Sequence, residues 1–273
     1  VDGDQIAESA EAAARRTDGD GNVFAGDYAI VGVGLGVLPD YEGSSHARIL
    51  PAAGATGKVG GVGFSLRGPG LTLDLIDDPR GARPGFRLGP SVRWRGNRSG
   101  KVHDPVVASL GKLKGGLDAG VSAGISFRRV LTHQDSLSLG VSARWDVSGR
   151  SAGLAVSPGV NYLLPVSRSM VTGLHISADW ISGARARHDF SVSPTQSLAS
   201  GLPAYRARGG VKSASAGAFM AIDLNGNLLD GGFSVGAGAM LTRLQGSAAK
   251  TPITALRGSR NQWLAGTGIA YAF

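Results

Sequence analysis

The chain has 273 residues, of which 44 are glycine and none is cysteine, and its formal net charge is +8. Without cysteine it has neither a disulfide framework nor a thiolate metal site, and no window of about eighteen apolar residues could form a spanning helix. The arginines stand singly on alternating positions without a nucleic-acid-binding motif, so we expect no nucleic-acid partner.

The first 26 residues lack the two-residue period of the rest of the chain. Residues 5–16 favour a short helix, and residues 17–26 are typical of a flexible linker. Val1 begins an acidic, alanine-rich stretch rather than a signal peptide, so we expect a processed or trimmed chain. We predict a periplasmic tail over residues 1–26 and an outer-membrane β-barrel over residues 27–273.

From residue 28 onward, apolar residues alternate with glycine, serine and single charged residues. This period of two predicts antiparallel strands, and the later segments reach the roughly nine to eleven residues that a tilted spanning strand needs. We predict a transmembrane antiparallel β-barrel of twelve strands, or of ten if the weak second to fourth segments are miscounted. The segments are residues 28–38, 47–56, 59–66, 71–75, 86–95, 117–127, 137–147, 154–164, 174–180, 209–222, 233–241 and 261–273.

The last segment, residues 261–273, has an apolar face with an aromatic residue at each end, and its other face is mostly glycine and alanine. Aromatic residues at strand ends are typical of the interfacial girdles of outer-membrane barrels. A soluble barrel or sandwich would also alternate, but its second face would carry more lysine, glutamate and threonine. We assign a lipid-facing girdle to Trp94, Trp145, Trp180, Trp263, Tyr271 and Phe273.

The connections between the strands differ in length in a regular way. From the fifth segment onward, long and short connections alternate, as they do in bacterial barrels with long extracellular loops and short periplasmic turns. Both chain ends then lie in the periplasm, and the number of strands is even. The long connections are residues 97–115, 182–208 and 245–260, and the short ones lie near residues 132–135, 165–169 and 225–227.

Charged residues on the glycine-rich face of the strands would line the lumen. One interpretation is a web of ion pairs that closes the barrel interior. The alternative is a basic pore that favours anions, because charged rings set the selectivity of a channel. The candidate lumenal residues are Arg87, Arg93, Arg95, Arg128, Arg144, Asp74, Asp118, Asp146, His175 and Asp179.

Two loops carry candidate contacts at the barrel mouth. In residues 39–44, Tyr41 and Glu42 belong either to a structural turn, with Tyr41 as a plug, or to a ligand site. Residues 182–208 are too long for a simple connection, and Pro203 and Tyr205 could anchor them in the lumen. This loop is either a constriction or a surface receptor loop.

We expect no catalytic, cofactor-binding or metal-binding residues. His175, Ser177 and Asp179 share one strand face. Neighbours on that face are about 6.5–7 Å apart, whereas a catalytic relay needs contacts of about 3 Å. The five histidines lie in separate segments without ligand spacing.

Several short stretches resemble the MltA-interacting protein (MipA)/OmpV family of outer-membrane proteins. They are Pro-Asp-Tyr-Glu-Gly-Ser at residues 39–44, Arg-Ile-Leu-Pro at 48–51, Ser-Val-Ser-Pro at 191–194, Ser-Gly-Leu-Pro-Ala-Tyr at 200–205, and residues 241–262. The resemblance covers about residues 28–273. It departs near residues 110–117, where Lys112 and Lys114 stand in place of acids.

The resemblance implies a barrel in the bacterial outer membrane, in contact with lipid and lipopolysaccharide. One family member is named as a scaffold that joins a lytic transglycosylase to a penicillin-binding protein, and others are linked to osmotic adaptation or adhesion. We therefore expect a non-enzymatic scaffold for periplasmic peptidoglycan-remodelling enzymes. The alternatives are a narrow channel for small anionic solutes and a surface receptor or adhesin.

Overall fold

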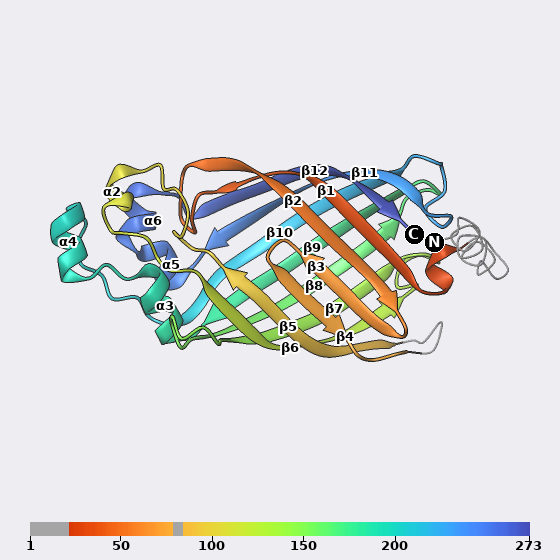
Figure 1. Ribbon diagram of the computed structural model, residues 1–273, viewed down its shortest axis with the longest axis horizontal. Helices are drawn as coiled ribbons and strands as arrows, with labels where there is room; N and C mark the ends of the chain where they lie inside the picture. The colour runs from red at the N-terminus through yellow and green to blue at the C-terminus, as the bar shows by residue number, and fades with distance from the viewer. Residues whose placement is uncertain (1–21, 79–83) are drawn as a thin grey trace, which may run out of the picture.

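The computed structural model describes residues 22–78 and 84–273. Within them, twelve antiparallel strands close into one barrel, in which each strand pairs with its neighbours in the chain and β1 pairs with β12 (Figure 1). The strands are β1 (Tyr28–Pro39), β2 (Ala47–Val59), β3 (Val62–Arg67), β4 (Gly70–Asp74), β5 (Gly85–Arg95), β6 (Gly116–Arg128), β7 (Ser136–Asp146), β8 (Leu154–Pro165), β9 (Met170–Ile181), β10 (Gly210–Asp223), β11 (Gly232–Leu244) and β12 (Asn261–Ala272).

The predicted fold class and the larger strand count are confirmed. The second strand is longer than expected and ends at Val59, where Gly60 and Gly61 make the turn with φ of 57° and 84°. Glycine suits this turn because both residues have left-handed backbone conformations. The predicted helix over residues 5–16 lies outside the described residues.

The outward faces of the strands are aliphatic and exposed. Val33, Ile176 and Ile269 are among the side chains that form this band. The glycines of β1 and β12 lie on the inward face, where Gly34 pairs with Gly268 and Gly36 with Gly266. An apolar exterior around a closed sheet is the arrangement that suits a bilayer, because a closed sheet pairs most of its backbone groups internally and has no free edge along its full length.

The two ends of the barrel differ. The C-terminus, the start of β1 and most of the short turns lie at one end, and the long connections with the α-helices of the described chain lie at the other (Figure 1). No helix of the described chain is long and apolar enough to cross a membrane. The helices are the 3-10 helix η1 (Val23–Ala25), which precedes β1, and α2 (Pro105–Ala108), α3 (Gly183–Phe190), α4 (Pro194–Ser200), α5 (Gly246–Lys250) and α6 (Pro252–Arg257).

The buried hydrophobic core lies at the helical end rather than inside the barrel. Both clusters of buried apolar side chains are built mainly from the long connections and the strand ends next to them. This end is therefore packed like the interior of a globular protein.

Candidate functional site

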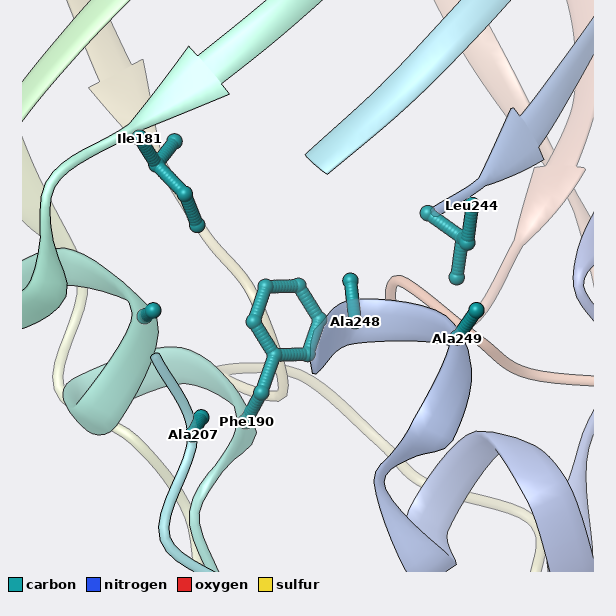
Figure 2. Close-up of a cluster of buried hydrophobic side chains, with 7 residues drawn as sticks. Ile181, Phe190, Ala207, Leu244, Ala248 and Ala249 are labelled. Carbon is teal, nitrogen blue, oxygen red and sulfur yellow. The ribbon is translucent and has the colours of Figure 1, made fainter. Parts of the chain in front are cut away.

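The outer connections pack together over the barrel mouth. We call residues 40–46, 96–115, 182–209 and 245–260 the lid. In its first cluster, Phe190 of α3 lies between Ile181 at the end of β9 and Ala248 of α5 (Figure 2). The start of α3 is capped locally, since the Ser182 side chain accepts a hydrogen bond from the backbone N–H of Arg185.

The second cluster of the lid surrounds Tyr41. This side chain is 4% exposed and packs with Val107, Val192 and Ile253, which come from three different connections. Burial, with the nearby charge of Asp104, raises the pKa of Tyr41 to about 12. The turn at residues 39–44 therefore contributes a plug side chain to the lid.

Buried ion pairs tie α3 to the barrel wall. Arg185 donates to both carboxylate oxygens of Asp118 on β6, at 2.9 and 2.5 Å, and to Asp189 at 3.2 Å. Arg95 at the end of β5 lies 3.2 Å from Asp189 and 3.3 Å from Asp146. A guanidinium that binds a carboxylate through two nitrogens fixes orientation as well as distance.

Further ion pairs join the other parts of the lid. Lys212 of β10 lies 2.8 Å from Glu42 and 3.3 Å from Asp179 of β9. Arg257 of α6 lies 2.9 Å from Asp104, which caps the start of α2. These contacts connect loops that are far apart in the sequence.

The first and last parts of the loop over residues 182–208 pack into the buried clusters of the lid. Tyr205 lies against both clusters, and its hydroxyl donates to the carbonyl oxygen of Ser247 at 3.3 Å. Pro203 is exposed, whereas its neighbour Leu202 is buried. Between these parts, α4 projects from the lid (Figure 1), and its Leu198 is 91% exposed.

The lumen below the lid has a polar side, formed by the inward faces of β3–β9. We call this the polar wall. Among the described residues, Arg87, Arg93 and Arg144 form no ion pair with an acid, and Arg144 donates to the hydroxyls of Ser91 and Ser157 at 3.3 and 3.5 Å. Arg128 lies at the far end of β6, opposite Ser136.

The ion pairs are thus distributed differently from the expected lumenal web. Of the five predicted arginines, only Arg95 is paired with acids among the described residues. Asp118 pairs with Arg185 of the lid, Asp146 pairs with Arg95, and Asp179 pairs with Lys212. The sequence analysis missed Arg185, Asp189 and Lys212; the Arg–Asp pair four residues apart was the available signal for a helix in that loop.

The opposite side of the lumen is formed by the inward faces of β1, β2 and β10–β12, which we call the apolar wall. It consists mainly of glycine and alanine with a few larger apolar side chains. Two cavities, of about 320 and 450 Å³, lie along it, and Phe219 borders both. The larger one also touches Arg67 of the polar wall.

His175 and Ser177 are closer than the strand spacing predicted. The imidazole Nε2 lies 3.0 Å from the Ser177 hydroxyl, and Nδ1 lies 2.8 Å from the Asn161 side-chain oxygen. The expected separation was wrong for this pair, whereas Asp179 accepts hydrogen bonds from Ser157 and Ser213. Ser177 is paired with β8 and β10 in the sheet, so its surroundings provide no free row of backbone N–H groups for an oxyanion.

The aromatic residues form two belts on the outer surface. Trp94, Trp145, Trp180 and Trp263 lie near the lid ends of their strands. At the other end, the Tyr271 ring packs edge-on against Phe233 and Phe273, with centroids 4.8 and 4.7 Å apart. Two belts separated by an aliphatic band match the two interfaces of a bilayer.

The model of the family described as "MltA-interacting protein MipA" matches residues 31–273. The chain belongs to the MipA family. This confirms the resemblance drawn from the sequence, and the barrel is an outer-membrane protein of that family. No curated protein matches the chain.

Solved outer-membrane barrels are similar in fold. The COG4313 outer membrane channel from Pseudomonas putida F1 is 15% identical, with 91% of this chain and 96% of that chain covered and a TM-score of 0.49. The toluene transporter TodX from Pseudomonas putida is 9% identical, with coverage of 90% and 88% and a TM-score of 0.38. OmpT of Vibrio cholerae is 7% identical, with coverage of 90% and 96% and a TM-score of 0.36. The likeness is one of fold alone.

Proposed function

We propose that this barrel is a non-conducting outer-membrane anchor that holds a periplasmic peptidoglycan-remodelling enzyme. The observation that carries the proposal is the lid, because packed side chains and buried ion pairs occupy the outer mouth. With that mouth filled, the periplasmic end is the side available for function. The description of the family names MltA, a lytic transglycosylase, as a partner, and a penicillin-binding protein is the second candidate.

The periplasmic turns offer a surface for such a partner. We call residues 129–135, 166–169 and 224–231 the rim. Leu131 is 78% exposed, and Leu229 is 50% exposed. The backbone N–H of Val23 donates to the carbonyl oxygen of Leu229 at 2.8 Å, so η1, in the described part of the predicted tail, lies against the rim. Exposed apolar residues next to an acidic tail suit a protein partner.

A pull-down from periplasmic extract tests the anchor. The detergent-purified chain should retain a lytic transglycosylase or a penicillin-binding protein. Loss of residues 1–21, or Leu131→Ser combined with Leu229→Ser, should weaken retention about tenfold, equivalent to about 1.4 kcal/mol. Leu256→Ser is the matched control, since Leu256 is 61% exposed but lies on the lid. If the unaltered chain retains neither enzyme, the proposal is wrong.

The second candidate function is a narrow channel for small anions. The unpaired arginines of the polar wall favour it, because they give the lumen a positive lining. The closed lid argues against it, and conductance recording decides between the two.

A further inference from the structure

The apolar wall contains space of ligand size. The larger cavity measures about 450 Å³ and is lined chiefly by the glycines and alanines of five strands, with Phe219 and Leu66. Ligand sites commonly measure about 300–1,000 Å³ and are mainly apolar. The smaller cavity continues along the same wall, since Gly36, Phe219 and Gly238 border both. Together they form a long apolar surface of small side chains.

Cationic groups lie at the edge of this space. One cross-strand row runs Gly54, Arg67, Gly70, Arg93, so two arginines flank a glycine that has no side chain. The row continues from Arg93 to Asp118, whose carboxylate binds Arg185. Among the described residues neither Arg67 nor Arg93 lies within ion-pair distance of an acid, and Arg67 borders the larger cavity. Guanidinium groups without a carboxylate partner favour an acidic group supplied by a ligand.

The strand pairing leaves a break in the wall beside the same cavity. β2 pairs with β1 along its whole length, but on its other side it pairs with β3 only over Gly54–Val59. Residues 47–53 therefore have no second strand partner in the described chain. The β3–β4 hairpin turns back at Gly68, partway along the barrel. Ala52 and Ala53 are exposed and border the cavity. A ligand that enters from the bilayer without passing the lid would cross the wall at this unpaired stretch.

We propose that the lumen binds a single-chain anionic amphiphile drawn from the membrane. The acidic head lies on Arg67 and Arg93, and the chain lies along the glycine-rich surface of the apolar wall. Binding of a membrane amphiphile is independent of the periplasmic anchor role, because it uses the lumen rather than the rim.

Photolabelling in phosphatidylcholine vesicles tests this site. The full chain is reconstituted with a trace of palmitate that carries a diazirine near the end of its chain, irradiated, and mapped by peptide mass spectrometry. We expect label on the inward residues Phe219 and Leu264 as well as on the lipid-facing Ile269. Ile269 serves as an internal standard, since any membrane-dissolved probe reaches it.

Variants separate a specific site from simple partitioning. Arg67→Gln combined with Arg93→Gln should lower the inward label about tenfold relative to Ile269, whereas Arg243→Gln, an arginine on the outer surface, should not. Gly36→Leu should also remove inward label by filling the cavity, because a Cβ at Gly36 would be 3.7 Å from its nearest neighbour. Heat-modifiable gel migration checks that each variant folds.

The same probe with an alcohol head should label the inward residues weakly. Absence of inward label on the folded unaltered chain would overturn the proposal. Equal inward label from the acid and the alcohol, or in the unaltered and double-glutamine chains, would overturn it too.

Discussion

The side chain of Arg185 ties α3 of the lid to the barrel wall. Its side chain is 8% exposed, and those of its partners Asp118 and Asp189 are 2% and 4% exposed. A buried ion pair adds little net stability over an apolar packing of similar volume. Removal of one partner, however, leaves an unpaired buried charge and costs about 3–5 kcal/mol. The lid therefore depends on each member of this group.

Arg185→Ala should open the lid. Asp118 and Asp189 would each lose one of their two arginine partners and keep only Arg95. The protection of α3 amides from hydrogen exchange should therefore fall by a factor that corresponds to about 3 kcal/mol. Arg187→Ala on the same helix is the control, since Arg187 is exposed. Equal protection in both variants would show that the ion pairs do not hold the lid.

Acid should loosen the lid through Asp189. Burial by itself would raise the pKa of Asp189, but the hydrogen bond with His188 and the charges of Arg95 and Arg185 outweigh burial and lower it. A lowered pKa in the folded lid means that the stabilisation is complete above the unfolded value of about 3.9 and is lost as pH falls through the folded value. Protection factors of α3 amides, corrected for intrinsic exchange, should fall below about pH 4. In Asp189→Asn, that part of the dependence should disappear.

At the scale of elements, barrel closure depends on how closely β1 approaches β12. A Cβ at Gly34 would overlap the carbonyl oxygen of Thr267 and lie 2.7 Å from the Cα of Gly268. At Gly36, two residues away on the same face, the nearest neighbour is 3.7 Å from the added atom. Glycine is therefore a steric requirement at the first position and not at the second.

Gly34→Ala should impair closure where Gly36→Ala does not. Overlap with backbone atoms cannot be relieved by a rotamer change, so we expect a loss of about 1–3 kcal/mol or more. Urea titration of the refolded protein, followed by heat-modifiable gel migration, measures the folded fraction. If Gly34→Ala unfolds at the same urea concentration as Gly36→Ala, the two strands have more freedom than the register indicates.

At the scale of the whole molecule, a solute that enters from the outer end would meet the lid before it meets the lumen. The lid occupies the mouth, while the lumen below keeps its arginines and two cavities. The barrel thus combines an arginine-containing lumen with a mouth covered by packed side chains.

Planar-bilayer recording should detect no conductance steps from the unaltered chain. Arg185→Ala should produce steps with a preference for anions, because opening the lid exposes the arginines of the polar wall. Arg187→Ala should stay silent. Steady conductance from the unaltered chain would instead favour the channel function.

Much of the barrel architecture could be predicted from the local alternation of apolar residues with small or polar ones. The alternation in residues 117–127 or 261–273 predicted both the strand and its lipid-facing side, because a side-chain period of two has only two faces to assign. The short strands β3 and β4 were harder to delimit, since their few residues carry little periodicity. The lid was foreseen only as long loops with a plug at Tyr41, and the periplasmic tail over residues 1–26 stays a prediction.

The sequence by itself determined a membrane barrel with an apolar exterior, because lipid on one side imposes a regular pattern on every strand. Only the tertiary structure decided which charges meet. Asp118 and Arg185 are 67 positions apart, and Glu42 and Lys212 are 170 apart. Contacts between residues so far apart in the sequence produce no periodic pattern that sequence analysis could detect. Closure of the barrel brings these charged residues together. It also places the lid over the mouth and sets the polar wall opposite the apolar wall in the lumen.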